Sequence, residues 1–445
     1  MTRDKLFPPR IIPGEIAPTR IPHRPSPAQQ PRDYPRPAYA ERFRCISSAC
    51  EDTCCQGWSV PIDQATYERY RSTEALKPHL GTLIVLNTAS PTTTDYARIP
   101  LTATSTCPFL STDHLCGIQK QLGPEALSVT CATYPRAIST VAAEREEALN
   151  LSCPEAARLT LLDPNLIAPI APSSYANLRS AESQLAIREF VLLLVADRAY
   201  PVWQRMYLLG ILARRLETLS GARTVADWAD ANPTTVAHML ADSTRIAVLQ
   251  RLRPLMDDIQ PQPAQQLQLV MELLRTRISQ PPAPPRFLEC VRDFESGLGC
   301  KTATCEQQIL TAYADAHRLY YEPFMLRHPH LLENYLTNYV FKNHYPFTHP
   351  RDRDLDLKQD QPDAETEHLI LCVHLALVQT LLIGMAGHYR EAFDSTHVVK
   401  LVQSFARTFE HSKQSQAQIK AFLRSHNLNR LGGIALLVQT PAMLE

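Results

Sequence analysis

The 445-residue sequence predicts a mainly helical protein, with a cysteine-rich metal-binding domain near its N-terminus followed by a helical domain. Composition is the first observation behind this fold class. The chain has 13 glycines but 36 prolines, which suits helices joined by proline-rich connections better than an α/β sheet with glycine turns. The second observation is that eight of the twelve cysteines lie between residues 45 and 153. The third is a helical repeat of apolar residues in the rest of the chain.

Charge and hydropathy limit the possible partners. Lysine plus arginine equals aspartate plus glutamate, at 45 each, so we expect no nucleic-acid and no membrane partner. The N-terminus lacks the apolar core of a secretory signal. The most apolar run, residues 369–385, is short for a membrane span and contains His374 and Gln379, which predicts a buried core helix. We therefore expect a cytoplasmic protein, where clustered thiols indicate metal binding or catalysis before disulfides.

The order of segments along the chain suggests three domains. Residues 1–38 hold ten prolines and few large apolar side chains, which predicts a disordered arm. Residues 39–162 form the predicted cysteine-cluster metal-binding domain, in which residues 81–87 are a candidate strand. A linker is expected at 163–174. The predicted helical domain spans 175–430, and the proline-rich stretch at 279–287 is a candidate division within it.

Helices in the C-terminal region are predicted from apolar spacing. The i, i+3, i+4, i+7 rule holds in three places, at 187–194, 209–216 and 332–339. Further helices are expected near 234–256, 264–278, 304–320, 329–344, 366–388, 395–410 and 414–426. No convincing alternating strand pattern occurs outside the cysteine-rich segment.

The cysteines point to a metal site because thiolates select iron–sulfur clusters, zinc or copper(I) over hard cations. A tetrahedral site of four sulfurs suits either zinc or an iron–sulfur cluster. The side chains of adjacent Cys54 and Cys55 point different ways, so either one ligates while the other packs, or two sites lie side by side. Any single cysteine could instead be a buried small hydrophobe. The candidate metal ligands are Cys45, Cys50, Cys54, Cys55, Cys107, Cys116, Cys131 and Cys153.

Two local sequences strengthen the metal interpretation. A proline follows Cys107, as in many iron–sulfur loops. Pro154 and Glu155 follow Cys153 and predict a helix that begins there, with Cys153 as its N-cap. The helix dipole is then expected to lower the pKa of the Cys153 thiol. The four later cysteines, Cys290, Cys300, Cys305 and Cys372, are better explained by packing.

Four segments, "FRCISSACEDTCCQGW", "CPFL", "LCGIQKQLGPEALSVTCATYPR" and "LSCPEAARL", resemble the flagellin lysine-N-methylase family. That family shares its cysteine motif with a wider group of zinc- or iron-chelating cysteine-cluster proteins. "LLENYLTNYVFKNHYPF", residues 331–347, is similar to the family's C-terminal helix, so the resemblance covers roughly residues 38–430. It implies a bacterial enzyme that transfers a methyl group from S-adenosylmethionine to the Nε of flagellin lysines. It also implies that the cysteines hold a [4Fe–4S] cluster, with zinc as the alternative.

Lysine methylation sets a defined chemical problem, because the attacking amine must be neutral and free lysine has a pKa near 10.4. The site must desolvate the amine or supply a base. No G-x-G-x-x-G motif follows a strand, so a Rossmann-type cofactor site is not expected. The candidate catalytic residues are Tyr134, Arg136 and Asp52, with Glu51 and the patch 333–335 as further candidates.

Each of these candidates also has a structural interpretation. Arg136 could bind the cofactor by clamping a carboxylate in a bidentate fashion, or it could pair with a nearby acid. Glu51 and Asp52 could cap a turn instead of acting in catalysis. At the level of function, the alternative is an iron- or zinc-binding cysteine-cluster protein without transferase activity, or a zinc site that only folds the N-terminal domain. The large helical region favours the methyltransferase.

Overall fold

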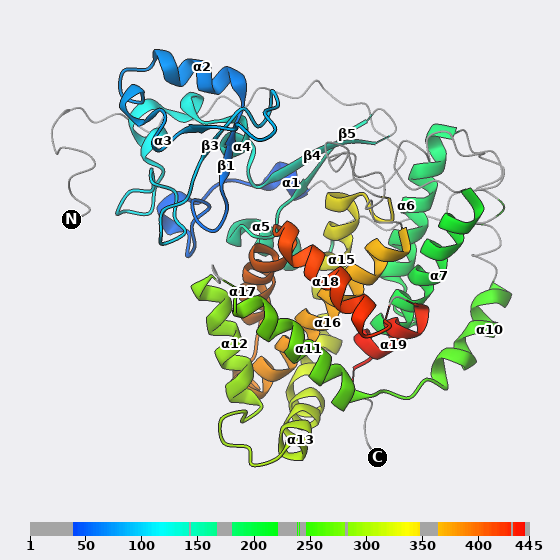
Figure 1. Ribbon diagram of the computed structural model, residues 1–445. Coiled ribbons are helices and arrows are strands. Elements are labelled where there is room, and N and C mark those ends of the chain that lie inside the picture. Colours follow the sequence, from blue (N-terminus) through cyan, green and yellow to red (C-terminus); the bar gives the residue numbers. More distant parts are fainter. Residues whose placement is uncertain are drawn as a thin grey trace.

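The computed structural model describes residues 39–141, 144–166, 180–220, 238, 240, 246–280, 284–347, 364–428 and 430–440. The protein is mainly helical, as predicted, and the strands of the described part all lie between residues 60 and 149. The predicted arm at 1–38 lies outside the described residues, as does most of the predicted linker. Figure 1 shows the cysteine-rich segment at one end of a larger helical body.

The cysteine-rich segment is built on a small antiparallel sheet of order β1-β3-β2. Strand β2 lies within the predicted strand at 81–87 but spans two residues. Apolar side chains from the sheet and the loops around it form a separate small core, which includes Ile62, Ile84 and Phe109. The elements are β1 (Val60–Ile62), α2 (Gln64–Ser72), β2 (Val85–Leu86), β3 (Ala97–Ile99), α3 (Gly117–Leu122) and α4 (Val129–Thr133).

A hairpin and two short helices connect this segment to the helical body. The hairpin consists of β4 (Arg136–Val141) and β5 (Glu144–Leu149), and it is followed by α5 (Pro154–Leu161). Helix α1 (Tyr39–Arg42) packs against β5 and α5. Two buried asparagines of α15 (His330–Asn343) fasten the connection. Asn338 accepts a hydrogen bond from the Tyr39 hydroxyl and donates one to the Leu149 carbonyl, and Asn334 donates to the Leu161 carbonyl.

The helical body has one continuous hydrophobic core, which runs from Ala148 to Val438. The proline-rich stretch at 279–287 separates α11 from α12, yet side chains on both sides of it lie in this core. The remaining helices of the described part are α6 (Ser180–Ala196), α7 (Val202–Ser220), α10 (Ile246–Asp257), α11 (Pro263–Ile278), α12 (Pro285–Gly297), α13 (Glu306–Ala316), α14 (Glu322–Arg327), α16 (Ala364–Tyr389), α17 (Ser395–Phe405), α18 (Lys413–Ser425) and α19 (Leu431–Val438), with π-helical turns at His317–Tyr321 and Ala406–Glu410.

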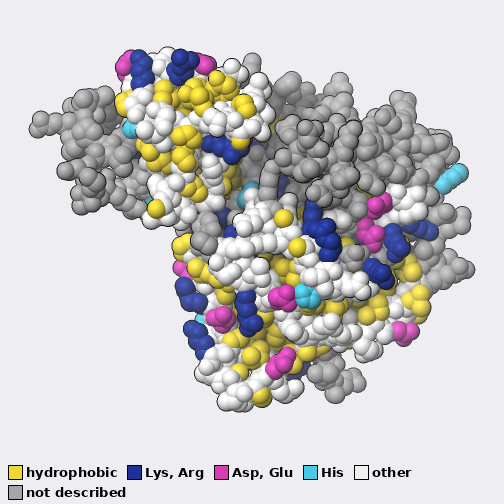
Figure 2. All heavy atoms as spheres, viewed as in Figure 1, with side chains coloured by type: hydrophobic (Ala, Val, Ile, Leu, Met, Phe, Trp, Pro, Cys, Tyr) yellow, Lys and Arg dark blue, Asp and Glu magenta, His cyan; other side chains and the backbone are white. Residues whose placement is uncertain are grey.

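Helix α16 lies at the centre of this core, in contact with α7, α12, α13, α17 and α19. It is apolar on all sides, which is the pattern of a helix surrounded by protein. Among the described residues, one helix, Ala364–Ala392, is long and apolar enough to cross a membrane, and its apolar window is completely buried inside the protein. The predicted core helix at 369–385 is therefore confirmed. On the face seen in Figure 2, basic and acidic side chains are interspersed.

Acid should destabilise the protein through histidines that are buried in this core. Both ring nitrogens of His374 lack a hydrogen-bond partner among the described residues, and burial lowers the pKa of its imidazole to about 4. An unfolded histidine titrates near pH 6.5. Between the two values the unfolded chain binds a proton that the folded protein does not. The free energy of unfolding should therefore fall as the pH drops from about 6.5 to 4.

We expect His374→Phe, which keeps a ring beside Tyr339 and Phe405, to remove part of this acid dependence. Urea unfolding of the native chain and the variant at pH 7 and pH 4.5 measures the effect. An equal loss of stability in both proteins on acidification would contradict the prediction.

Candidate functional site

Four of the eight predicted ligands converge through backbone pairing between loops. The Cys107 amide donates to the Cys55 carbonyl at 2.7 Å, next to an isolated antiparallel bridge between Gln56 and Thr106. A second bridge joins Leu110 to Cys116. The Cys55 thiol consequently has hydrogen-bonding contacts with the sulfur atoms of Cys54, Cys107 and Cys116. We call these four residues, Cys54, Cys55, Cys107 and Cys116, the thiol cluster.

Contacts within the thiol cluster favour thiolates. The contact with Cys55 lowers the pKa of Cys116 to about 6 and that of Cys54 to about 7, and it also lowers the pKa of Cys107. The pKa of the Cys55 thiol is raised, because its proton is shared with three sulfur neighbours. Burial opposes ionisation at all four positions. A depressed thiol pKa provides the form of cysteine that ligates metals.

The other four predicted ligands lie outside the thiol cluster. Cys131 is a close neighbour, and burial raises the pKa of its thiol to about 12, with further increases from the charges of Cys116 and Cys54. Cys45, Cys50 and Cys153 form a second neighbourhood, in which each of the first two raises the pKa of Cys153. The eight cysteines are thus divided into two groups rather than gathered at one point.

The structure confirms Cys153 as the N-cap of α5, with Pro154 at the first helical position. The expected lowering of its thiol pKa is wrong, however. Amide groups of Glu155 and Ala156 do lower this pKa, but burial has the larger effect and raises it to about 12. The prediction failed because it considered the helix terminus and ignored the desolvation that comes from packing on α1 and the hairpin.

All twelve cysteines are free. No set of three or more histidine, cysteine, aspartate or glutamate side chains in the described part of the chain is arranged to hold a metal ion. The thiol cluster therefore brings soft donor atoms together without forming a closed coordination shell. Of the later cysteines, Cys290 and Cys372 are buried, as packing residues should be, whereas Cys305 is exposed.

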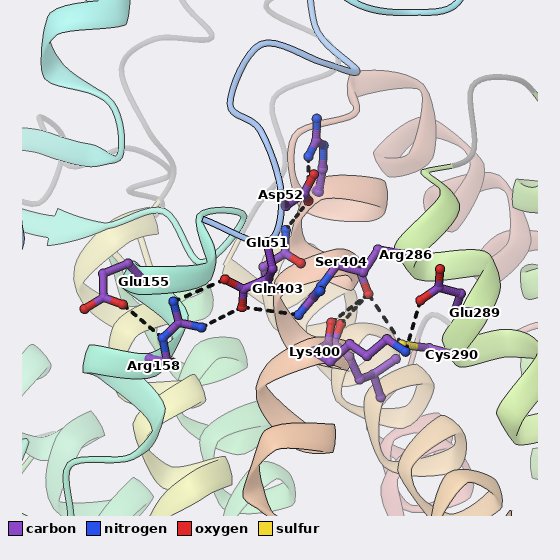
Figure 3. A network of polar contacts seen from close by, with 12 residues as sticks. Glu51, Asp52, Glu155, Arg158, Arg286, Glu289, Cys290, Lys400, Gln403 and Ser404 are labelled. Carbon is purple, nitrogen blue, oxygen red and sulfur yellow. Dashed lines mark hydrogen bonds and ion pairs between the residues drawn. The ribbon is translucent and has the colours of Figure 1, made fainter. Parts of the chain in front are cut away.

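The loop that carries Cys54 and Cys55 is attached to the helical body by two carboxylates (Figure 3). Asp52 forms an ion pair with Arg407 at 2.6 Å and accepts a hydrogen bond from Gln403 at 2.9 Å. The side chains of Asp52 and Arg407 are only 13% and 8% exposed. Glu51 lies between Arg158 of α5 and Arg286 of α12, at 2.6 and 3.5 Å. Both acids thus make long-range ion pairs.

Of these partners, Arg407 lies in a π-helical turn, Ala406–Glu410, that follows α17. The Arg407 guanidinium also donates to the Gln56 carbonyl and lies under Gly57, whose φ of 86° requires glycine. Glu410 forms a buried ion pair with Lys342 and accepts from the Tyr335 hydroxyl. Turns with π geometry occur frequently at functional sites because they redirect side chains.

Tyr134 begins a chain of hydrogen-bonded side chains that crosses from the cysteine-rich segment to the helical body. Its hydroxyl lies 2.9 Å from the Ser152 hydroxyl, which lies 2.7 Å from His411 Nε2. The charges of Cys153, Cys54 and Arg407 all affect the pKa of Tyr134, so the phenol is near both cysteine groups. Burial keeps this pKa well above its usual value, so the phenol stays protonated.

His411 is partly desolvated although water can reach it. The residue is exposed, yet the protein around it lowers the pKa of its imidazole to about 4, first by desolvation and then through the positive charge of Lys342. Cys54 shows the same combination, since it is exposed while its thiol carries a desolvation penalty.

Two further catalytic candidates, Arg136 and Glu333, have ion-pair partners outside the thiol cluster. Arg136 lies on β4, where it is 3.7 Å from Glu147, donates to the Phe43 carbonyl and stacks over the Phe43 ring. This pairing with a nearby acid is the structural alternative that the sequence left open. Glu333 is paired with Arg198 and Arg205. Of the predicted catalytic residues, Tyr134 and Asp52 therefore lie beside the thiol cluster.

Sequence reasoning missed four residues of this site: Ser152, Gln403, Arg407 and His411. Each acts through a partner that is distant in sequence, and nothing in its local sequence distinguishes it. Ser152 precedes a predicted ligand, which was the one available signal. Arg407 and His411 lie at a π-helical turn that apolar spacing does not predict.

Comparison with known proteins finds similarity to lysine N-methylases and to a flagellar biosynthetic protein. The family model for the FliB lysine N-methylase C-terminal domain matches residues 188–437. The lysine-N-methylase of Salmonella typhimurium is 37% identical over 134 residues, which are 30% of this chain and 33% of that protein. The flagellar biosynthetic protein FliU of Salmonella muenchen is 36% identical over 134 residues, or 30% of this chain and 79% of that protein.

The alignment thus spans about a third of the length of the Salmonella typhimurium relative. The family model lies outside the cysteine-rich segment, so the cysteine motif itself stays a prediction. No solved structure matches the chain.

We expect Asp52→Ala to lower the free energy of unfolding by about 3 kcal/mol, because it leaves the buried Arg407 guanidinium without its carboxylate partner. The control is Asp113→Ala, which removes an exposed carboxylate paired with Lys120 in the same segment and should leave the midpoint unchanged. Urea unfolding at pH 7 compares the two variants. Equal midpoints would mean that the Asp52–Arg407 pair does not hold the loop.

Proposed function

The chain belongs to the FliB lysine N-methylase family, and from this membership we propose that it methylates the Nε of lysine side chains on flagellin. The proposed methyl donor is S-adenosylmethionine. The names of the relatives, a lysine-N-methylase and a flagellar biosynthetic protein, support both the reaction and the substrate. Flagellin would be modified in the cytoplasm before its export.

The observation that carries the proposal is the thiol cluster near the hydrogen-bonded side chains of Tyr134, Ser152 and His411. Four sulfur donors, three of them with a lowered thiol pKa, have the chemistry that suits an iron–sulfur cluster. Cys107, Cys116 and one of the adjacent pair Cys54 and Cys55 would hold that group, because three cysteine ligands leave one iron of a [4Fe–4S] cluster open. The open iron would accept the amine and carboxylate of the methyl donor.

Residues of the chain itself would prepare the lysine. In methyl transfer, the amine lone pair forms a bond to the methyl carbon, the carbon–sulfur bond breaks, and its electron pair stays on sulfur. The amine must first lose a proton, and partial desolvation at the site would lower its pKa. Asp52 is held in an ion pair with Arg407, which gives it a positioning role rather than that of a base. Tyr134, whose phenol lies near both groups of cysteines, remains the candidate.

The alternative is an iron- or zinc-binding protein without transferase activity. The thiol cluster alone would serve either function, because zinc also accepts four thiolates. The chain of polar side chains that joins the thiol cluster to the helical body favours the enzyme, since metal storage needs no such arrangement. Colour separates zinc from iron: a zinc site is colourless, and an iron–sulfur protein is brown.

The test is the intact mass of flagellin that has been co-expressed with the native chain or with variants, under iron-replete conditions. We expect methyl increments with the native chain. The double variant Cys54→Ser, Cys116→Ser should abolish them, because it removes the two most acidic thiols of the cluster. Cys305→Ser, which changes an exposed cysteine outside the site, is the matched control.

Unmodified flagellin with the native chain would reject the transferase and favour the metal-binding alternative. Full methylation by the double variant would show that the activity does not require the thiol cluster.

A further inference from the structure

We infer that Tyr134, Ser152 and His411 form a proton relay, which takes the proton of the attacking lysine ammonium and delivers it to water at the exposed His411. This inference rests on the proposed function. It assigns a role to Ser152 and His411, two residues to which the proposed function gives none.

Geometry is the first argument for the proton relay. Both links have hydrogen-bond length, at 2.9 and 2.7 Å. Ser152 is only 5% exposed and joins the two rings, one from the cysteine-rich segment and one from the helical body. Its own backbone carbonyl accepts from Gln403 at 2.8 Å, which fixes the serine in place. A buried serine that joins a phenol to an imidazole can pass a proton without moving its backbone.

The surroundings of His411 determine which atom donates the proton at each hydrogen bond of the relay. Desolvation is the largest effect that opposes a positive charge on the imidazole. Lys342 of α15 and Arg407 of the π-helical turn oppose it as well, and Glu410 only partly offsets them. A neutral ring offers one nitrogen as an acceptor. If Nε2 accepts from the Ser152 hydroxyl, then the serine oxygen accepts from the Tyr134 hydroxyl. The phenol oxygen keeps a lone pair for a donor that enters the site.

In the proton relay, each N–H or O–H bond that breaks is matched by one that forms. The ammonium N–H bond breaks as its proton moves to the phenol oxygen. The phenol proton moves to the Ser152 oxygen, and the serine proton moves to His411 Nε2. The imidazolium that results is disfavoured by Lys342 and Arg407, so it releases a proton to the water that reaches this exposed residue. The lysine nitrogen is left neutral, with its lone pair free to attack.

A purely structural role is the competing explanation, since the same bonds connect the residues on either side of the hairpin to the helical body. Kinetics against pH distinguishes the two. With purified holoenzyme, flagellin and S-adenosylmethionine, Ser152→Ala should lower the methylation rate at pH 7 by about 100-fold or more. The rate should recover as the pH approaches the lysine pKa, because a deprotonated amine needs no relay.

Tyr134→Phe and His411→Gln should show the same rate loss and the same recovery. Tyr70→Phe is the matched control, because it removes a phenol hydroxyl that donates to the Ala126 carbonyl outside the relay. Unfolding midpoints and iron contents close to native values show that each variant is folded and loaded. If folded and loaded relay variants keep the native rate and pH profile, the relay is overturned.

A measurement that does not depend on methylation activity tests which groups donate in the relay. Nitrogen NMR of histidine-labelled protein at pH 7 should show His411 neutral with its proton on Nδ1, and Ser152→Ala should shift the Nε2 resonance. A proton on Nε2 would reverse the chain and overturn the relay. If native holoenzyme transferred no methyl group, the proposed function would fail, while the NMR result would still decide the orientation of the three side chains.

Discussion

The buried ion pair between Asp52 and Arg407 is the interaction on which the site depends. The cysteine loop has almost no regular secondary structure of its own, so its position must be fixed by side chains from elsewhere. A desolvated ion pair does this effectively, because removing either partner leaves an uncompensated charge. Glu51 adds a second attachment through Arg158 and Arg286 (Figure 3). The loop that carries Cys54 and Cys55 is thus positioned by the helical body.

The helical body can act as this scaffold because its core is continuous and apolar. Helix α16 is covered on all sides and holds α12, α17 and α19 in place. The π-helical turn after α17 then places Arg407, Glu410 and His411 at the boundary with the cysteine-rich segment. The three residues have different partners: a carboxylate in the cysteine loop, a buried lysine and a serine in the turn between the hairpin and α5. The π-helical turn therefore connects the helical body to the cysteine-rich segment.

Much of the fold could be predicted from the sequence, because the helices carry regular apolar spacing. The predicted helices at 264–278, 329–344 and 414–426 agree closely with α11, α15 and α18. Helix α12 was missed because the prolines before it indicated a break, although Pro285 occupies the first helical position, where proline is favoured. The grouping of the cysteines and the partners of Asp52 were not predictable, because they depend on contacts between residues far apart in sequence.

The most direct test of this account is the iron and sulfide content of anaerobically purified protein, compared between the native chain and Arg407→Leu. The account predicts that native protein carries iron and sulfide and is brown. It predicts that the folded variant, in which the cysteine loop has lost its anchor, carries little of either. Native protein without iron, or an Arg407→Leu variant with the full native content, would contradict the claim that the helical body positions the thiols for a cluster.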